Sequence, residues 1–355
     1  MLLGAEALVR LTLRPIDSLE VLLTATDRRV HLADRRNARI YEGDPLLFWR
    51  LRPHLAEAPW DLTRVTTNAQ HLRYPRPVGR KPAGAYRVVC LGDSVTFGYR
   101  VPLRFPERPQ DDEPSGRPYP GLLEQALRAA NPGREIEVIP LAVPGYSSYQ
   151  GLAWLRRDID WLAPDLVTAC FGWNDICRRA VSDRDAMPAD RLRVLARGLT
   201  ARSQALLRLR HRIDRLRGRP AGPPAGGTLR VPRQEYVSNL LAMAELASRQ
   251  GARVVLVGPV YRDRVSSPAE AEDMAAHRAA LKSAAEARGI PYLEIAELTE
   301  RSYPENDRLF GELIHPNHLG HRLLAERLGA FLGREGLLGT MRPPVWEAGA
   351  PQAPN

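Results

Sequence analysis

The sequence contains few cysteines, and their spacing excludes two kinds of site. Only three occur among 355 residues, Cys90, Cys170 and Cys177, and no two of them are spaced as CxxC. A disulfide framework needs a denser, even-numbered set, and structural zinc sites commonly use closely spaced pairs. Cys90 and Cys170 lie in apolar runs, where a free cysteine usually packs as a small hydrophobic residue. We therefore expect neither a disulfide framework nor a structural metal.

Long apolar runs are absent too. No stretch of 18 uncharged apolar residues occurs, so the sequence contains no complete membrane span. The first residues, MLLGAEALVRLTLRP, are interrupted by Glu6 and Arg10 and make a poor secretion signal. The expected compartment is the cytoplasm by default, and an exported or membrane-anchored form would need further residues upstream of Met1.

Lysine is nearly missing, with only Lys81 and Lys282, so the net charge of +10 rests on arginine. This charge is local, because residues 191–219 hold ten arginines against one aspartate. Four apolar residues there recur at the spacing of one helix face: Leu206, Leu209, Ile213 and Leu216. A basic amphipathic helix suits peripheral contact with a membrane or another polyanion, and a solvated face on an insertion has the same pattern. Interleaved aromatics and a nucleic-acid-reading motif are missing, so we expect no nucleic-acid partner.

Short apolar stretches alternate with helical patterns through most of the chain. Five stretches have the composition of buried strands: 86–92, 135–143, 165–172, 252–260 and 290–296. Helical patterns lie between and after them, at 152–162, 233–249, 270–288 and 317–332. Buried strands that alternate with helices predict a mostly parallel sheet covered on both faces, which is an α/β fold.

Outside this α/β region the composition changes. Residues 1–83 are rich in arginine and proline, and we expect an irregular or β-rich N-terminal extension packed on the main domain. The main domain covers 84–335 and carries an insertion at 178–232, in which 218–227 is a flexible Pro/Gly stretch. Residues 336–355 are predicted to form a flexible tail.

The stretch VVCLGDSVTFGYRV, residues 88–101, brings polar residues straight after a buried strand. Phosphate-binding motifs do not fit, because Gly92 and Gly98 do not make GxGxxG and no lysine follows for a P-loop. Ser94 therefore stands at the carboxyl end of the first strand, where open α/β sheets bind ligands. A helix that begins just after it would direct backbone N–H groups to the same point. Taken alone, the stretch favours Ser94 as an ordinary helix cap.

The stretch ELIHPNHLGH places His315 directly before Pro316. Proline disfavours helical geometry in the residue before it, so His315 is expected on a loop that ends at a helix start. There it can act as a general base toward Ser94, with Glu312 holding its other ring nitrogen. A merely structural loop histidine is the plainer alternative.

A metal site is a further alternative at this stretch. Four potential ligands recur every three residues: Glu312, His315, His318 and His321. On one helix, however, His315 and His321 would point about 120° apart, and Pro316 takes His315 out of the helix. We therefore expect no metal ion here.

Two further strand ends offer hydrogen-bond donors. Asn174 in GWND follows the third strand, and its side-chain amide can donate to a developing oxyanion. Gly145 in LAVPGYSS follows the second strand and offers an unhindered backbone N–H. Each is an ordinary turn when taken singly. Together with Ser94 and His315 they bring a nucleophile, a base and oxyanion donors to one edge of one sheet.

Over about residues 86–333 the sequence resembles the SGNH (GDSL-type) esterases and lipases. The resemblance lies in GDSVTFG, the region of Gly145, GWND and ELIHPNHLGH. It implies a flavodoxin-like three-layer α/β/α sandwich with a five-stranded sheet and no cofactor. It also implies Ser94 as nucleophile, His315 as base, and the N–H of Ser94, the N–H of Gly145 and the amide of Asn174 as the oxyanion hole.

Two positions depart from the family pattern. The family commonly has aspartate three residues before the catalytic histidine, and this chain has Glu312, whose reach is one methylene longer. Near the end of the second strand the family usually has asparagine, and Pro140 stands close to that place. Glu312 takes the place of that aspartate as the residue expected to orient His315.

The sequence therefore predicts a serine hydrolase that cleaves carboxylic esters, with short acyl groups such as acetyl on a carbohydrate or small metabolite. An O-acyltransferase that passes the same acyl group to a glycan would need the same residues and is the first alternative. A protein whose role is surface binding through 191–219 is the second.

Overall fold

A five-stranded parallel sheet forms the centre of the computed structural model. The structure describes residues 2–16, 37–104, 112–188, 190–216, 227–260, 267–299, 306–312 and 314–346. The sheet consists of β5 (Tyr86–Gly92), β6 (Ile136–Ala142), β7 (Leu166–Cys170), β10 (Arg253–Val257) and β11 (Tyr292–Leu293). Their spatial order is β11-β10-β7-β5-β6, and all neighbours are parallel. Numbered along the chain this is 2-1-3-4-5, the flavodoxin-like order, which confirms the predicted fold class.

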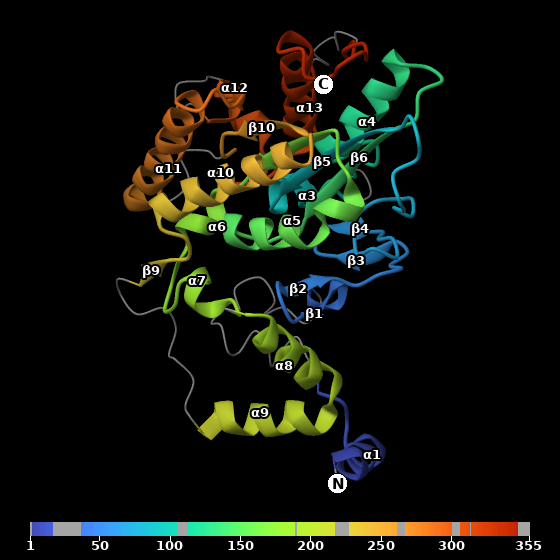
Figure 1. Ribbon diagram of the computed structural model, residues 1–355, viewed down its shortest axis with the longest axis vertical. Helices are drawn as coiled ribbons and strands as arrows, with labels where there is room; N and C mark the ends of the chain where they lie inside the picture. Colours follow the sequence, from blue (N-terminus) through green and yellow to red (C-terminus); the bar gives the residue numbers. More distant parts are fainter. Residues whose placement is uncertain are drawn as a thin grey trace.

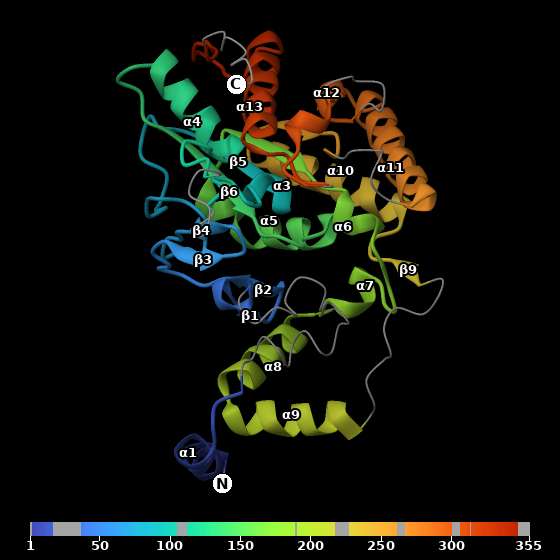
Figure 2. The same cartoon turned by 180° about the vertical axis from the view of Figure 1, so that it is seen from behind.

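Helices cover both faces of the sheet, as Figures 1 and 2 show. On one face lie α5 (Ser148–Leu162), α10 (Arg233–Arg249) and α11 (Pro268–Glu286); on the other lie α4 (Tyr119–Ala130) and α13 (His318–Arg334). Alternate residues of each strand enter different cores. In β5, for example, Val89 and Leu91 join the first core, and Val88 and Cys90 join the second. A strand buried on both faces needs apolar residues at every position, and this is why 86–92 reads as one continuous apolar run.

Most of these elements were predicted from the sequence, but several predicted ends differ from the observed ones: the strand predicted at 165–172 ends at Cys170, and the helix predicted at 152–162 begins at Ser148. The predicted helix 233–249 matches α10, and the predicted strand 86–92 matches β5. The predicted strand 252–260 stops at Val257, and 290–296 shortens to β11, followed by the short helix α12 (Ala296–Thr299). Apolar composition alone does not locate a strand end, because apolar residues that continue into a buried loop look the same.

The N-terminal extension shares the core of the main domain. It contains two small hairpins, β1 (Tyr41–Asp44) with β2 (Phe48–Leu51), and β3 (Ala58–Trp60) with β4 (Thr63–Val65). Tyr41, Trp49 and Trp60 are buried in the same apolar cluster as the residues of α5 and α10. The Tyr146 hydroxyl adds a hydrogen bond to the Trp49 carbonyl at 2.5 Å.

At the very start of the extension the expectation of irregular or β structure is wrong, because Leu2–Thr12 is a helix, α1. The predicted basic amphipathic helix in the insertion corresponds to α9 (Gln204–Leu216), and a further helix, α8 (Arg191–Arg202), precedes it. Both figures show α1, α8 and α9 together at one end of the molecule, with α13 at the opposite end. Apart from Gly227, the predicted flexible stretch 218–227 lies outside the described residues.

The predicted tail begins later than residue 336. Leu338 and Met341 are buried in the core beneath α4 and α13, and Pro344 contacts Gly329 of α13 so closely that a Cβ there would lie 2.6 Å from its ring. Residues 336–346 therefore belong to the main domain, and 347–355 lie outside the described residues. The stretch looked flexible because it is rich in proline and alanine, but its apolar residues indicate that it packs on the core.

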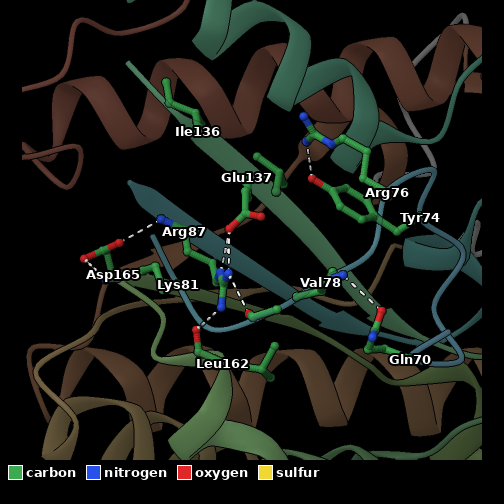
Figure 3. A network of polar contacts seen from close by, with 12 residues as sticks. Gln70, Tyr74, Arg76, Val78, Lys81, Arg87, Ile136, Glu137, Leu162 and Asp165 are labelled. Atoms are coloured by element: carbon green, nitrogen blue, oxygen red, sulfur yellow. Dashed lines mark hydrogen bonds and ion pairs between the residues drawn. The ribbon is translucent and has the colours of Figure 1, made fainter. Parts of the chain in front are cut away.

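A buried arginine network fixes the amino end of the sheet (Figure 3). The Arg87 side chain is fully buried and donates to the Glu137 carboxylate and the Leu162 carbonyl, each at 2.7 Å, and to the Gly79 carbonyl at 3.1 Å. The Asp165 carboxylate accepts from the Arg87 backbone N–H at 2.7 Å and from Lys81 at 2.8 Å. These contacts tie β5, β6, the end of α5 and the segment before β5 together at the end of the sheet away from Ser94.

We expect the buried residue His321 to make the stability of the protein depend on pH. It is fully buried in α13, its Nδ1 accepts from the Tyr119 N–H at 3.2 Å, and burial together with nearby positive charge lowers its pKa to about 3. A histidine whose pKa is depressed in the folded protein contributes stability that is present above its unfolded pKa near 6.5 and is lost as the pH falls. When the pH falls from 7 to 5, the free energy of unfolding of the parent protein should therefore drop by about 2 kcal/mol more than that of a His321→Gln variant.

Urea unfolding at both pH values measures this difference. His318→Gln is the matched control, because His318 is a partly exposed histidine on the same helix. The same pH dependence in the parent and in His321→Gln would show that His321 is not held neutral by burial.

Candidate active site

Three strand ends stand side by side at the carboxyl edge of the sheet. Gly92 of β5 pairs with Ala142 of β6 on one side and with Cys170 of β7 on the other. The predicted site residues Ser94, Gly145 and Asn174 follow these strand ends within two to four residues. The chain order reverses between β5 and β7, and in open α/β sheets ligands bind at that switch point. The sheet topology therefore delivers all three residues to the expected ligand site.

The turn after β5 places Ser94 at the start of the short helix α3 (Ser94–Phe97). The Asp93 carboxylate caps this helix by accepting from the Val95 N–H at 2.9 Å. The interpretation of Ser94 as the helix cap is therefore wrong, because the residue before it has that role. Gly92 permits the tight turn, since a Cβ there would lie 1.9 Å from Thr96 Oγ1. Gly98 ends α3 in left-handed geometry with a φ of 81°, which favours glycine.

Ser94 and His315 come together across 221 residues of chain. Ser94 Oγ and His315 Nε2 lie 2.8 Å apart, and the other ring nitrogen, Nδ1, contacts the Glu312 carboxylate. Ser94 is 6% exposed, so it is buried from most directions. A hydroxyl, an imidazole and a carboxylate in this order have the geometry of a nucleophile, a general base and its orienting acid.

The loop that carries His315 is closed on itself. Phe310 and Pro316 form an antiparallel bridge, and the Gly311 N–H donates to the His315 carbonyl at 3.0 Å. Within this loop the Glu312 carboxylate also accepts from the His315 backbone N–H at 3.0 Å. The longer side chain of glutamate fits here because it folds back within the loop, so that its carboxylate contacts both the backbone N–H and the ring of His315.

The three histidines considered as metal ligands, His315, His318 and His321, lie in different surroundings. α13 begins only at His318, capped by Asn317, so His315 lies outside the helix as Pro316 predicts. His318 faces Glu113, with His318 Nε2 3.8 Å from its carboxylate, and His321 is buried against Tyr119. Among the residues that the structure describes, no group of three or more histidine, cysteine, aspartate or glutamate side chains is arranged to hold a metal ion.

The predicted oxyanion donors also lie at this edge. Asn174, in α6 (Trp173–Ile176), is buried, and its Nδ2 donates to the Asp93 carboxylate at 3.2 Å. An amide nitrogen carries two hydrogens, so one remains for a substrate oxygen. Burial raises the pKa of Asp93 to about 6, against the opposing effect of the Val95 N–H, His315 and Asn174. Asp93 thus orients the Asn174 amide as well as capping α3.

Gly145 has a φ of 86°, and its carbonyl is held by the arginine of a buried ion pair. The Arg230 guanidinium donates to the Gly145 carbonyl at 2.8 Å and to both oxygens of the Asp183 carboxylate at 3.0 and 3.1 Å. Gln150 and Ser147 complete this network at the start of α5. The sequence signal for it is an arginine between two apolar residues, Leu229 and Val231, in an otherwise irregular stretch.

Tyr99 is the residue at this site that the sequence analysis missed. Its ring stacks on the His315 ring with 4.2 Å between ring centroids and an angle of 27° between planes. Trp60 of the N-terminal extension contacts the Tyr99 ring edge-on at 5.2 Å. The stack holds the imidazole in plane and places an aromatic face against a ring that becomes positively charged when it takes a proton. Tyr99 is thus a positioning residue for His315.

We expect Tyr99→Leu to lower kcat for a phenyl ester by about tenfold with little change in KM, because a face-on aromatic contributes about 1–2 kcal/mol to a partly buried cation. Tyr99→Phe keeps the ring and should keep kcat within about twofold of the parent. Steady-state kinetics of both variants make the comparison. Equal losses in the two variants would place the effect in the hydroxyl rather than in the stack.

A small cavity of about 90 Å³ lies beside the His315 ring. The residues that line it include Leu62, Tyr99, Val101, Glu312, His315 and Pro316. A larger cavity of about 640 Å³ lies behind α3, where Arg73, Glu124 and Arg128 line it; neither Ser94 nor His315 borders it. Of the predicted site residues, His315 and Glu312 border the small cavity, whereas Ser94, Gly145 and Asn174 do not line it.

Comparison with known proteins places this geometry in a family. A profile of the GDSL-like Lipase/Acylhydrolase family matches residues 90–323, which include Ser94, Gly145, Asn174 and His315. An arylesterase of Vibrio mimicus is 32% identical over 89 residues, which are 25% of this chain and 38% of that protein.

Two solved structures are similar at low sequence identity. A GDSL-like lipase from Bacteroides thetaiotaomicron is 15% identical, with a TM-score of 0.43, over 74% of this chain and 93% of that one. An acetylxylan esterase from Geobacillus stearothermophilus is 19% identical, with a TM-score of 0.45, over 70% of this chain and 95% of that one. Because the family profile covers most of the chain, this protein belongs to the GDSL-like Lipase/Acylhydrolase family, a family of carboxylic ester hydrolases.

Proposed function

We propose that this protein hydrolyses carboxylic esters of short acyl groups through an acyl-enzyme formed on Ser94. The observation that carries the proposal is the contact of 2.8 Å between Ser94 Oγ and His315 Nε2, with the Glu312 carboxylate on the other ring nitrogen. Family membership supports the same reaction class. Geometry and chemistry support the role that we propose for each residue.

The reaction proceeds in two displacements. Ser94 Oγ attacks the carbonyl carbon of the ester while His315 Nε2 takes its proton, and the carbonyl oxygen becomes an oxyanion. The N–H groups of Ser94 and Gly145 and the Asn174 amide stabilise that oxygen, and one such donor contributes about 2.7–4 kcal/mol. The alcohol leaves with the proton from His315. Water then attacks the acyl-serine, with His315 as base again, and releases the acid.

Glu312 keeps the imidazole in the tautomer that the first step needs. Burial tends to raise the pKa of Glu312, but the His315 hydrogen bonds and charge, with help from Arg100, outweigh it and leave this pKa lowered. The carboxylate therefore remains ionised at neutral pH and accepts from His315 Nδ1–H, which leaves Nε2 free to take the serine proton. It also stabilises the imidazolium once that proton has moved.

We propose acetyl esters of a carbohydrate or small metabolite as the substrate class. The name of the arylesterase relative makes a phenyl ester a suitable first probe.

A panel of p-nitrophenyl esters from acetate to octanoate tests this proposal. We expect kcat/KM to fall by at least about tenfold from acetate to octanoate, because a misfitting methylene costs about 1–3 kcal/mol. A flat or rising profile would contradict the short-acyl proposal but not ester hydrolysis. No turnover of any ester, or acyl transfer to an added oligosaccharide in preference to water, would contradict hydrolysis itself.

A further inference from the structure

The helices α1, α8 and α9 expose an unusual amount of apolar surface. We call them, with the residues that flank them, the helical appendage (residues 2–16 and 190–216); Figures 1 and 2 show it at one end of the molecule. Eight of the twelve large apolar side chains that the described residues expose lie on it: Leu8, Leu11, Leu13, Leu192, Leu195, Leu199, Leu209 and Leu216. Scattered exposed leucines are normal, but such a concentration marks an interaction surface.

These leucines form stripes rather than random exposures. In α8, Leu192, Leu195 and Leu199 lie on one helix face, are each more than 60% exposed, and no residue of this helix is buried. In α9, Leu209 and Leu216 lie seven residues apart on one face, whereas Leu207 on the other side is fully buried. The buried side of α9 therefore holds that helix, and the leucine stripes of both helices face solvent.

Arginines flank both stripes. At 100° per residue, Arg210 and Arg212 lie on either side of the Leu209–Leu216 stripe of α9, and Arg191 and Arg202 lie to one side of the stripe of α8. Burial, Arg210 and Arg193 all lower the pKa of Arg197, so these positive charges lie close to one another. An apolar stripe bordered by arginine is the pattern of helices that lie in the membrane interface.

The appendage is held together by specific contacts. The Glu6 carboxylate of α1 accepts from the Ser203 hydroxyl at 2.7 Å and from the first backbone N–H groups of α9, and the Arg10 side chain donates to the Arg202 carbonyl at 2.8 Å. The Arg197 guanidinium of α8 lies over the Phe48 ring at 5.0 Å and donates to the Ala186 carbonyl at 2.9 Å. The exposed leucines thus belong to a defined unit that is anchored on the N-terminal extension.

We propose that the helical appendage docks the protein on an anionic membrane surface, with α8 and α9 lying in the interface. The leucine stripes would enter the boundary of the acyl chains, and the flanking arginines would contact lipid phosphates. A nucleic acid or other polyanion would pair with the arginines but leave the leucines in water. Among the described residues no helix is both long and apolar enough to cross a membrane, so the proposed contact is peripheral. The proposal does not depend on the chemistry at Ser94.

Vesicle flotation of the full chain tests the proposal. The protein should float with vesicles that contain phosphatidylglycerol, bind pure phosphatidylcholine vesicles at least about tenfold more weakly, and lose binding as salt rises. The triple variant Leu192→Ser, Leu195→Ser, Leu199→Ser should bind at least about tenfold more weakly, because each exposed leucine contributes apolar contact with the membrane. Its control is Leu319→Ser with Val345→Ser, which removes exposed apolar side chains outside the appendage and should bind like the parent.

Charge is tested separately. Arg191→Gln with Arg210→Gln and Arg212→Gln should reduce binding to the anionic vesicles and weaken its salt dependence, whereas Arg249→Gln with Arg288→Gln should not. Every variant should retain the parent rate on a soluble ester and the parent unfolding midpoint, which shows that folding is intact.

Three results would overturn the proposal. The first is absence of binding to either vesicle, and the second is binding that the leucine variant leaves unchanged. The third is concentration-dependent dimers in the parent that the leucine variant abolishes without any vesicle binding, since a second copy would then cover the stripes. Heparin binding without vesicle binding would likewise assign the appendage to a polyanion.

Discussion

Replacing Ser94 with alanine is expected to reduce kcat for p-nitrophenyl acetate by on the order of 10⁴–10⁶-fold. The variant loses the oxygen that forms the acyl-enzyme, and His315 is left without the hydroxyl whose proton it takes. The fold should be unaffected, because Asp93 and not Ser94 caps α3. Steady-state kinetics and the unfolding midpoint of the same preparation make both measurements.

The control for this result is a double variant, which tests whether the effects of removing Ser94 and His315 are non-additive. Groups that act as one unit lose most of their effect when any one of them is removed. The double variant Ser94→Ala with His315→Ala should therefore be no slower than Ser94→Ala by more than a few-fold. A parent-like rate for Ser94→Ala, or losses that multiply in the double variant, would contradict a shared role.

Arg87→Met is expected to destabilise the fold by about 3–5 kcal/mol. The methionine keeps most of the side-chain length but leaves the Glu137 carboxylate, which is 8% exposed, without its charged partner. It also removes the donors to the Leu162 and Gly79 carbonyls. Removing one partner of a buried ion pair leaves an uncompensated charge, and this is the main source of the loss.

Urea unfolding measures the effect, and two variants make it specific. Arg327→Met removes the partner of Glu297 in an exposed ion pair and should change the free energy of unfolding by no more than about 1 kcal/mol. Arg87→Met with Glu137→Leu removes both charges and should recover much of the lost stability. A single variant as stable as the parent would show that the network in Figure 3 does not fix the sheet.

The sequence predicted the elements whose pattern is local. Strand β5 and helix α10 match their predicted bounds, because continuous apolar runs and helical periodicity are properties of short windows. The convergence of Ser94, Gly145 and Asn174 was also predictable, since the carboxyl ends of parallel strands meet at one edge.

Features that depend on distant partners were not predictable. Helix α1 is short, and Glu6 ties it to the start of α9 some 200 residues later. Tyr99 sits in the quoted stretch at 88–101, but its role arises only when the His315 loop closes over its ring. Likewise, Asp93 reaches Asn174 only because β5 and β7 are paired in register.

Covalent labelling with a fluorophosphonate tests whether Ser94 is the nucleophile and His315 its base. Attack by Ser94 Oγ on phosphorus expels fluoride while His315 takes the serine proton, which leaves a stable phosphonyl-serine. Peptide mass spectrometry should find a single adduct, on the peptide that contains Ser94, and His315→Ala should slow its formation by at least about a hundredfold. An adduct on another residue, or equal labelling of Ser94→Ala, would show that Ser94 is not the nucleophile.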